Sequence, residues 1–299
     1  MNRKELNRAY IALGLVSFFW GTTFIASRIG AQHMPGLFLS AMRQFSSGLL
    51  MVSFFLLKGY KLPDWKSLKQ ITIQGIFLLS LANGLLTWAL EFINSGFVAI
   101  ISATVPLFVT LFSLWLLRTA KLTFWMIAGL VIGFAGVVLI FYDYLNQLQG
   151  KSAAFGIVLA FLSVLAWTFG TVYTSRLKPA TDILFSVGLQ MLIGGMITML
   201  LCFATGKYIN LSQIGYAAWL ALIYLILFGS LLAYSAYVFA ISKLPPTFVS
   251  IYAYINPIVA VFFGWLLLHE NVNRGMLLGT VVTLGGVYMV NREYKKQKV

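Results

Sequence analysis

Arg43 is the residue of this chain best suited to bind a charged ligand, because it lies seven residues beyond Gly36 in an otherwise apolar run. A guanidinium within hydrocarbon costs several kcal/mol unless it has a partner or a hydrated cavity. Its planar fork of donors fits a carboxylate. Arg43 is therefore expected either to hold an anionic group of a ligand, or to pair with Glu91 or backbone carbonyls and fix helix packing.

Two further charged residues stand at the ends of apolar runs. Glu91 is one of only seven acidic residues and follows the run 70–90. We expect it to act as a proton-titrating gate or as the partner of Arg28 or Arg43; the alternative is a solvated loop acid. Arg28 belongs either to a gate at the mouth of a cavity or to the interface, where its long side chain would snorkel and anchor the helix end.

Aromatic residues make up 16% of the chain, and several lie in the middle of apolar runs. Tyr252 and Asn256 are four residues apart and share one helix face. Pro106 and Pro257 predict helix kinks, and the carbonyl that a proline frees is tolerated where it lines a cavity. A mid-run amide such as Gln190 is expected to face the interior. The expected lining of a semi-polar cavity is Arg43, Trp20, Trp88, Trp167, Gln190, Tyr237, Tyr252 and Asn256; the alternative for each is packing between helices or against lipid.

Other chemistries find no support in the sequence. The single cysteine and the two histidines have no neighbours at metal-ligand spacing, and no phosphate-binding loop or nucleophile motif is present. We therefore expect no catalytic residues, no metal and no cofactor. The net charge of +14 does not indicate nucleic acid, because Lys and Arg stand in short stretches between apolar runs.

The elements that must position these residues are membrane-spanning helices. The chain has 299 residues, 60% hydrophobic and 9% charged, whereas soluble domains average about 25% charged. About twenty apolar residues cross a bilayer as a helix. The predicted fold is all-α with ten spans at 9–28, 36–57, 70–90, 96–117, 123–142, 153–174, 183–203, 215–239, 247–268 and 274–291.

The distribution of basic residues predicts the orientation. With the N-terminus inside, sixteen of the 21 Lys and Arg residues fall on the inner side and four on the outer side, with Arg43 inside a span. Cytoplasmic loops carry the excess of Lys and Arg, so both termini are expected to be cytoplasmic.

The two halves of the chain resemble each other. MRQFSSGLL (42–50) aligns with LQMLIGGMI (189–197), which places Arg43 on Gln190. SGFVAIISATVPLFV (95–109) aligns with PTFVSIYAYINPIVA (246–260), which places Pro106 on Pro257. The repeat contains five spans, an odd number, so the second copy must enter the membrane from the other side. We expect two inverted domains, residues 1–150 and 151–299.

Several ordered segments carry a family resemblance. They are WGTTFIASRIG (20–30), ALEFINSGFVAIISATVPLF (89–108), FGTVYTSR (169–176), IYAYINPIVAV (251–261) and HENVNRGMLLGTVVTLGGVYMV (269–290). Together they resemble the EamA family of the drug/metabolite transporter superfamily, and within it the YedA-like inner-membrane transporters. The resemblance implies a multi-pass protein of the bacterial inner membrane that moves small metabolites or toxic compounds.

The expected function is a secondary transporter, an exporter of small metabolites such as amino acids or drug-like compounds, working by alternating access. The alternative is an uncoupled, channel-like facilitator. A membrane enzyme is disfavoured because the acids are sparse and dispersed. The expected partners are a small solute and the lipid bilayer, not nucleic acid. The chain is expected to be a monomer; the alternative is a homodimer formed through the glycine clusters of spans five and ten.

Overall fold

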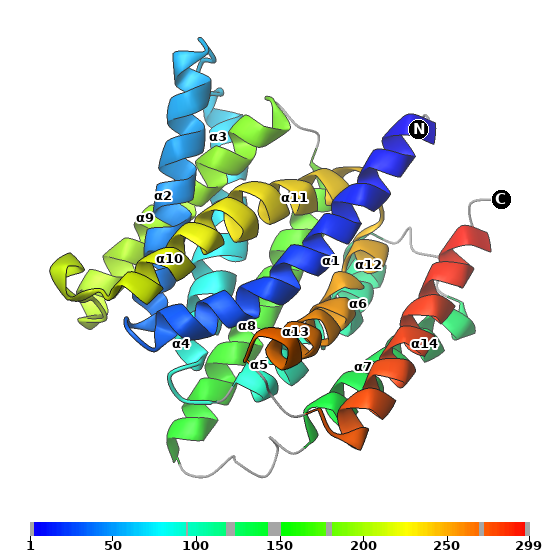
Figure 1. The fold of residues 1–299 in the computed structure, drawn as a ribbon. Helices are drawn as coiled ribbons and strands as arrows, with labels where there is room; N and C mark the ends of the chain where they lie inside the picture. The colour runs from blue at the N-terminus through cyan, green and yellow to red at the C-terminus, as the bar shows by residue number, and fades with distance from the viewer. Residues whose placement is uncertain are drawn as a thin grey trace.

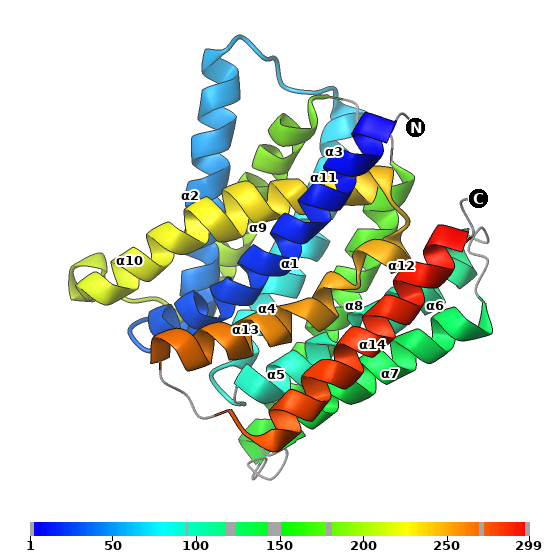
Figure 2. The same cartoon turned by 45° about the vertical axis from the view of Figure 1, so that its right-hand side comes forward.

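The computed structural model describes residues 3–93, 95–117, 123–142, 151–177, 181–268 and 272–296. Residues 269–271 of the segment 269–290 and residue 94 of the segment 89–108 lie outside the described residues. The described chain is a bundle of helices without a strand (Figures 1 and 2). The elements are α1 (Arg3–Ala31), α2 (Gly36–Leu57), α3 (Trp65–Gln74), η1 (Gly75–Asn83), α4 (Gly84–Ala89), α5 (Ser95–Ser102), α6 (Val105–Leu117), α7 (Phe124–Ile140), α8 (Lys151–Arg176), α9 (Ile183–Thr205), η3 (Leu211–Gln213), α10 (Tyr216–Tyr224), η4 (Leu225–Leu232), α11 (Ala233–Lys243), α12 (Pro246–Val249), α13 (Tyr252–Leu268) and α14 (Arg274–Lys296).

Eight helical stretches of the described chain are long and apolar enough to cross a bilayer. They are Arg3–Ala31, Gly36–Leu57, Trp65–Ala89, Val98–Trp115, Ser152–Arg176, Ile183–Thr205, Tyr216–Lys243 and Pro246–Leu266. A ninth apolar helix, Phe124–Ile140, is shorter. The remaining run that the sequence predicts, 274–291, forms α14, whose last turns are strongly charged. The all-helical membrane architecture is thus confirmed.

Two of the spanning stretches contain a π-helix that hydropathy does not reveal. The stretch Trp65–Ala89 passes through η1, and the stretch Tyr216–Lys243 passes through η4. A π-helix widens the turn and shifts the backbone hydrogen bonds, and such turns often lie at functional sites. Leu79 in η1 and Gly229 in η4 are 150 residues apart.

Two other stretches are interrupted rather than kinked. The backbone leaves helical geometry at residues 103–104, between α5 and α6, and again at residues 250–251, between α12 and α13. Pro106 is the second residue of α6 and follows the first break, whereas Pro257 lies inside α13. Thr104 and Ser250 donate their hydroxyls to the carbonyls of Ile101 and Thr247, which satisfies a carbonyl beside each break.

Glycines allow two helix pairs to pack backbone against backbone. A side chain at Gly48 of α2 would overlap Leu192 of α9, and one at Gly195 of α9 would overlap Phe45 of α2. The pair α7 and α14 lies side by side at one edge of the bundle (Figures 1 and 2), with Gly129 and Gly286 in contact. These glycines therefore serve packing within one chain.

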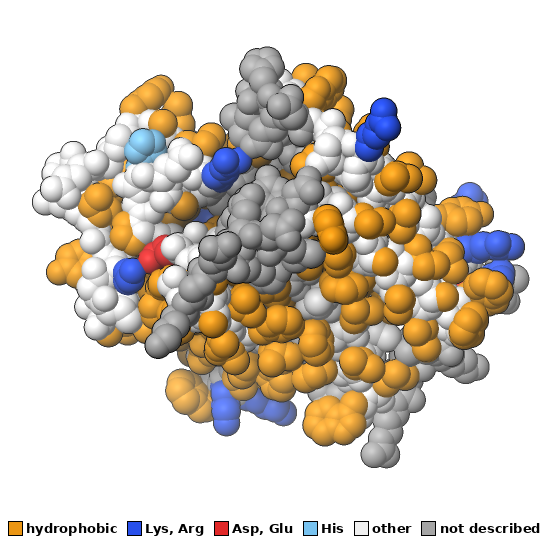
Figure 3. Space-filling model, turned by 90° about the horizontal axis from the view of Figure 1, so that it is seen from below, with side chains coloured by type: hydrophobic (Ala, Val, Ile, Leu, Met, Phe, Trp, Pro, Cys, Tyr) orange, Lys and Arg blue, Asp and Glu red, His pale blue; other side chains and the backbone are white. Residues whose placement is uncertain are grey.

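The outside of the bundle is apolar. Leu57, Phe124 and Trp115 expose 89%, 75% and 72% of their surface, which suits contact with lipid rather than water. Figure 3 shows apolar side chains gathered over much of the lower face, with few charged ones between them. The start of α1 and the end of α14 lie on the same side of the bundle (Figures 1 and 2).

Candidate functional site

A cavity of about 150 Å³ lies where α1, α2, α5, α8 and α13 meet the stretch from η1 to α4. The part of α1 that lines it runs from Trp20 to Ser27, in the second half of that helix, so the cavity lies in the half of the bundle away from the chain ends. The lining residues are Trp20, Thr23, Phe24, Ser27, Arg43, Ala82, Asn83, Leu86, Thr87, Leu90, Val98, Ala99, Ser102, Val105, Ser163, Val164, Trp167, Tyr252, Ala253, Asn256 and Pro257. Six residues singled out from the sequence, including Arg43, thus meet at one site.

Arg43 is the only charged residue in this described lining. It is 8% exposed, and its Nε donates to Ser230 Oγ of η4 at 2.8 Å. The side chain lies directly against Gly229, where a Cβ atom would stand 2.7 Å from Nη2. Arg43 makes no ion pair with a carboxylate of the described residues. The guanidinium is therefore held at its Nε, while the rest of the fork is left to the cavity.

Trp20, Trp167 and Tyr252 form an aromatic wall of the cavity, and Tyr237 packs behind the two tryptophans. The ring of Trp20 lies 5.3 Å from Trp167, 4.9 Å from Tyr252 and 5.2 Å from Tyr237. Trp20 Nε1 donates to the Gly229 carbonyl of η4 at 3.0 Å. Trp167 Nε1 is buried beside Tyr252 and makes no hydrogen bond of normal geometry. The two tryptophans therefore both contact Tyr237 but differ in their hydrogen bonding.

Three residues expected in the lining lie elsewhere. Tyr237 is fully buried behind Trp20 and Trp167, and its hydroxyl shares a hydrogen bond with Thr171. Trp88 packs edge-on against Phe155 at 5.8 Å. Gln190, the third, contacts a separate crevice. Trp88 faces away from the cavity because a helix turns about 100° per residue, and its neighbours Leu86 and Thr87 face it instead. Tyr237 and Gln190 belong to α11 and α9, which contribute no residue to the described lining.

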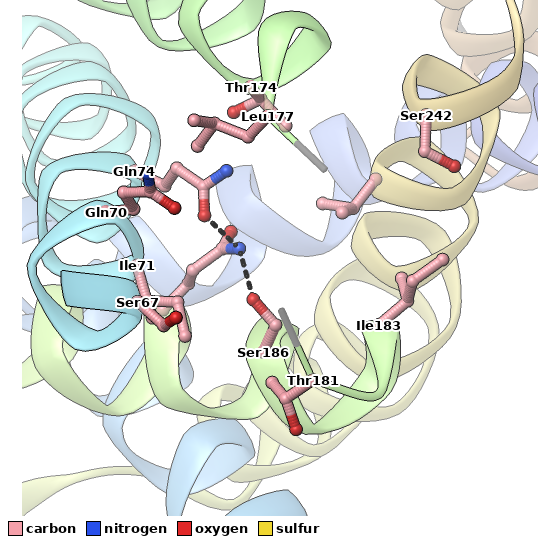
Figure 4. A pocket seen from close by; sticks show the side chains of 12 residues that line it. Ser67, Gln70, Ile71, Gln74, Thr174, Leu177, Thr181, Ile183, Ser186 and Ser242 are labelled. Carbon is pink, nitrogen blue, oxygen red and sulfur yellow. Dashed lines mark hydrogen bonds between the residues drawn. The ribbon is translucent and has the colours of Figure 1, made fainter. Parts of the chain in front are cut away.

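The crevice near Gln190 lies on the side of the chain ends and measures about 50 Å³ (Figure 4). Gln190 Nε2 donates to Gln74 Oε1 at 2.8 Å and to Ser186 Oγ at 3.3 Å, and Gln190 Oε1 accepts from Tyr234 at 2.6 Å. Ser67 at its rim donates to Asp64, and this hydrogen bond lowers the pKa of that carboxyl. Unlike Arg43, Gln190 is fully engaged by its neighbours.

The two residues expected at a gate lie at the periphery. Glu91 pairs with Lys207 at 2.6 Å, and the structure places neither Arg28 nor Arg43 in an ion pair with it. This pair joins the end of the α4 stretch to the connection after α9. Arg28 is exposed at the end of α1, and Ser27 lines the cavity instead. In the described part of the chain, no cluster of three His, Cys, Asp or Glu residues could hold a metal.

Comparison with known proteins identifies the group to which this chain is related. The EamA-like transporter family matches it twice, over residues 7–142 and 154–292. The chain belongs to the EamA-like transporter family. Among its relatives, the uncharacterized inner membrane transporter YedA of Escherichia coli K12 is 33% identical over 286 residues, covering 94% of this chain and 90% of YedA.

More distant matches cover the chain as fully. The uncharacterized transporter YoaV of Bacillus subtilis is 25% identical and covers 97% of this chain and 99% of its own length. A solved crystal structure with 16% identity superposes with a TM-score of 0.79, covering 98% of this chain and 99% of the other. At that identity the superposition shows a shared fold.

Within this EamA-like chain, sequence reasoning missed the partners of the central residues. Ser230 and Gly229 hold Arg43 and Trp20, and Ser102 and Asn83 complete the polar lining. The signal available for Ser230 was weak: a Gly-Ser pair in the apolar run 215–239. Small polar residues are common in membrane helices, so the pair alone does not indicate a site.

Proposed function

We propose that this chain is a secondary transporter of the bacterial inner membrane that carries small solutes with an anionic group. The observation that carries the proposal is Arg43, buried in the wall of a cavity without a carboxylate partner among the described residues. A buried guanidinium without a counter-ion is costly, and a bound anion would remove that cost. The membership in a family of transporters and the name of YedA support this reading.

The proposed architecture has ten spans in two inverted halves, with α7 and α14 as the fifth and tenth. Several pairs of features support it. The family match occurs twice, η1 and η4 lie at equal places in the two halves, and the chain breaks at 103–104 and again at 250–251. The excess of Lys and Arg on one side supports cytoplasmic termini. The cavity would then open to the outside.

Alternating access follows from an exchange between the two halves. Trp20 and Trp167 are repeat equivalents, as are Gly229 and Leu79. At present Trp20 Nε1 donates to the Gly229 carbonyl, while Trp167 Nε1 makes no normal hydrogen bond. In the inward-open state, Trp167 would bond the backbone of η1 near Leu79 and Trp20 would release η4. The unsatisfied indole supports this exchange, because a buried donor without a partner is costly.

The carrier mechanism is favoured over the channel-like facilitator by what lies between cavity and crevice. Trp20 and Trp167 contact Tyr237, which stacks near Tyr234, which in turn bonds Gln190 of the crevice. This continuous wall of side chains supports a mechanism that opens one side at a time. Export is the proposed direction. Glu91 and Lys207 are proposed to tie the outer ends of the two halves together.

Reconstitution into proteoliposomes tests the proposal. We expect carboxylate uptake or counterflow that depends on the protein and is lost in Arg43→Gln, which places at position 43 the residue of the repeat equivalent. Arg28→Gln, an equal loss of charge outside the cavity, is the matched control and should retain transport. Full activity of a normally folded Arg43→Gln protein would refute the role of the guanidinium.

A further inference from the structure

Resting on the proposed transport function, we infer that the solute is an organic monoanion with a single aromatic or similarly flat apolar body and no ammonium group. Zwitterionic amino acids and cationic compounds would then be poor ligands of this cavity. The inference depends on the balance of charges, the balance of hydrogen-bond donors and the size of the cavity.

The charge balance favours a ligand with one negative charge. Arg43 supplies one positive charge, and no carboxylate belongs to the described lining. The nearest described acid along the chain, Glu91, is already paired with Lys207. An ammonium group on a bound amino acid would lie close to the guanidinium with only neutral acceptors around it. Burial of such a charge without a counter-ion is strongly unfavourable.

The hydrogen-bonding groups of the lining also favour an acceptor-rich ligand. Among the described residues, Nε is the one nitrogen of the Arg43 guanidinium with a hydrogen-bond partner, and Ser102 Oγ and Trp167 Nε1 have none of normal geometry. The acceptors are largely engaged: Asn83 Oδ1 accepts from Ser40 Oγ at 3.1 Å, and the Ala82 carbonyl accepts from Ser163 at 2.7 Å. A carboxylate would satisfy the free donors, whereas an ammonium would compete with them.

The rest of the cavity determines the body of the ligand. Its apolar surface comes from rings and aliphatic side chains, namely Trp20, Phe24, Leu86, Leu90, Val98 and Trp167. A cavity of about 150 Å³ lined by apolar side chains accommodates a benzene ring. Aromatic rings at 4.9 to 5.3 Å from one another offer edges and faces for a further ring. One ring with a short acidic side chain therefore fits the site.

Three probes with the same phenyl ring and two-carbon linker separate the charge classes. At neutral pH, 3-phenylpropionate is an anion, L-phenylalanine a zwitterion and 2-phenylethylamine a cation. Each is titrated calorimetrically into the purified full chain in detergent and tested for counterflow in proteoliposomes. We expect 3-phenylpropionate to bind at least about tenfold more tightly than L-phenylalanine, a difference of about 1.4 kcal/mol, and 2-phenylethylamine not to bind.

Two variants link any preference to the proposed site. Arg43→Gln should abolish the preference for 3-phenylpropionate, and Arg43→Lys, which keeps the charge but not the fork, should retain part of it. Circular dichroism and thermal unfolding of each variant establish that it is folded. If both variants unfold, Ser230→Ala is used instead, because it removes only the partner of Arg43 Nε. It should weaken the binding of 3-phenylpropionate and leave the binding of the other two probes unchanged.

The outcomes distinguish this inference from the proposed function. Equal or tighter binding of L-phenylalanine or 2-phenylethylamine, with counterflow that still requires Arg43, would overturn the monoanion class and leave the transporter standing. A preference for 3-phenylpropionate that persists unchanged in a folded Arg43→Gln variant would overturn the site. Absence of protein-dependent counterflow for all three probes and for a panel of small carboxylates would refute the transport function itself, and the inference with it.

Discussion

Substitution of Gly229 by alanine should weaken binding of an anion without removing any charge. The new Cβ atom would stand 2.7 Å from Nη2 and 3.1 Å from Cζ of Arg43, and 2.9 Å from Cγ2 of Thr23. Nonbonded heavy atoms prefer separations of about 3.5 to 4.0 Å, so the guanidinium must shift by roughly 0.5 to 1 Å. That shift would strain or break the 2.8 Å bond from Nε to Ser230.

The expected loss of affinity follows from the hydrogen bond between Arg43 Nε and Ser230. A hydrogen bond to a charged group contributes about 1.5–3 kcal/mol. If Gly229→Ala misplaces the guanidinium by this amount of free energy, the dissociation constant for 3-phenylpropionate should rise by roughly 10- to 150-fold. The main chain of η4 should tolerate the change, because the nearest atoms belong to side chains.

Calorimetric titration of the purified protein measures this effect, with thermal unfolding alongside to establish integrity. Gly285→Ala in α14 is the matched control, because no heavy atom lies within 4 Å of the added Cβ atom there. It should leave binding unchanged and slightly raise the midpoint of unfolding, since alanine favours helix over glycine. Affinity of Gly229→Ala within twofold of the unmodified protein would refute the dependence of binding on the position of Arg43.

Three further comparisons test other parts of the structure. Trp20→Phe should lower the free energy of unfolding by about 1 kcal/mol more than Trp167→Phe, because only the first removes a normal hydrogen bond; chemical denaturation of both variants measures the difference. Glu91→Gln should change the unfolding midpoint little, as expected for an ion pair near the surface worth less than about 1 kcal/mol, and a large loss of stability at low and high salt alike would contradict this. Gly136→Ala should destabilise the protein by about 1–3 kcal/mol through overlap with Thr283, and unchanged thermal unfolding would show that α7 and α14 separate without penalty.

Much of the architecture and part of the site follow from the sequence. Apolar runs long enough to cross a bilayer predict the spanning helices, because lipid selects for their length and composition. A charge in mid-span requires a partner or a cavity, so the sequence predicts that Arg43 lines one, together with Trp20 and Trp167, and the structure brings these three residues to one cavity. The rings of Trp20 and Trp167, which come from different halves of the chain, lie 5.3 Å apart.

The π-helices, the direction in which side chains face and the long-range partners depend on geometry that residue types do not encode. Replacing an α-turn by a π-turn leaves hydropathy unchanged, so η1 and η4 have no signature in the apolar pattern. Trp88 lies in a helix that lines the cavity but on its other face, and Tyr237 lies in α11, which contributes no residue to the described lining. The partner of Glu91 is 116 residues away, and only the folded chain brings Lys207 to it. Sequence reasoning therefore identified Arg43 but not the neighbours that hold it.

The segment η4 bonds two walls of the cavity at adjacent residues. Its Gly229 carbonyl accepts from Trp20, and its Ser230 hydroxyl accepts from Arg43. Rotation of this short segment would consequently carry the cation and the indole together, so neither can be repositioned independently. Because such coupling is reciprocal, a ligand that stabilises this arrangement raises the free energy needed to rotate the segment by the same amount. The affinity of the cavity for its ligand and the free energy of rotating η4 would then be coupled.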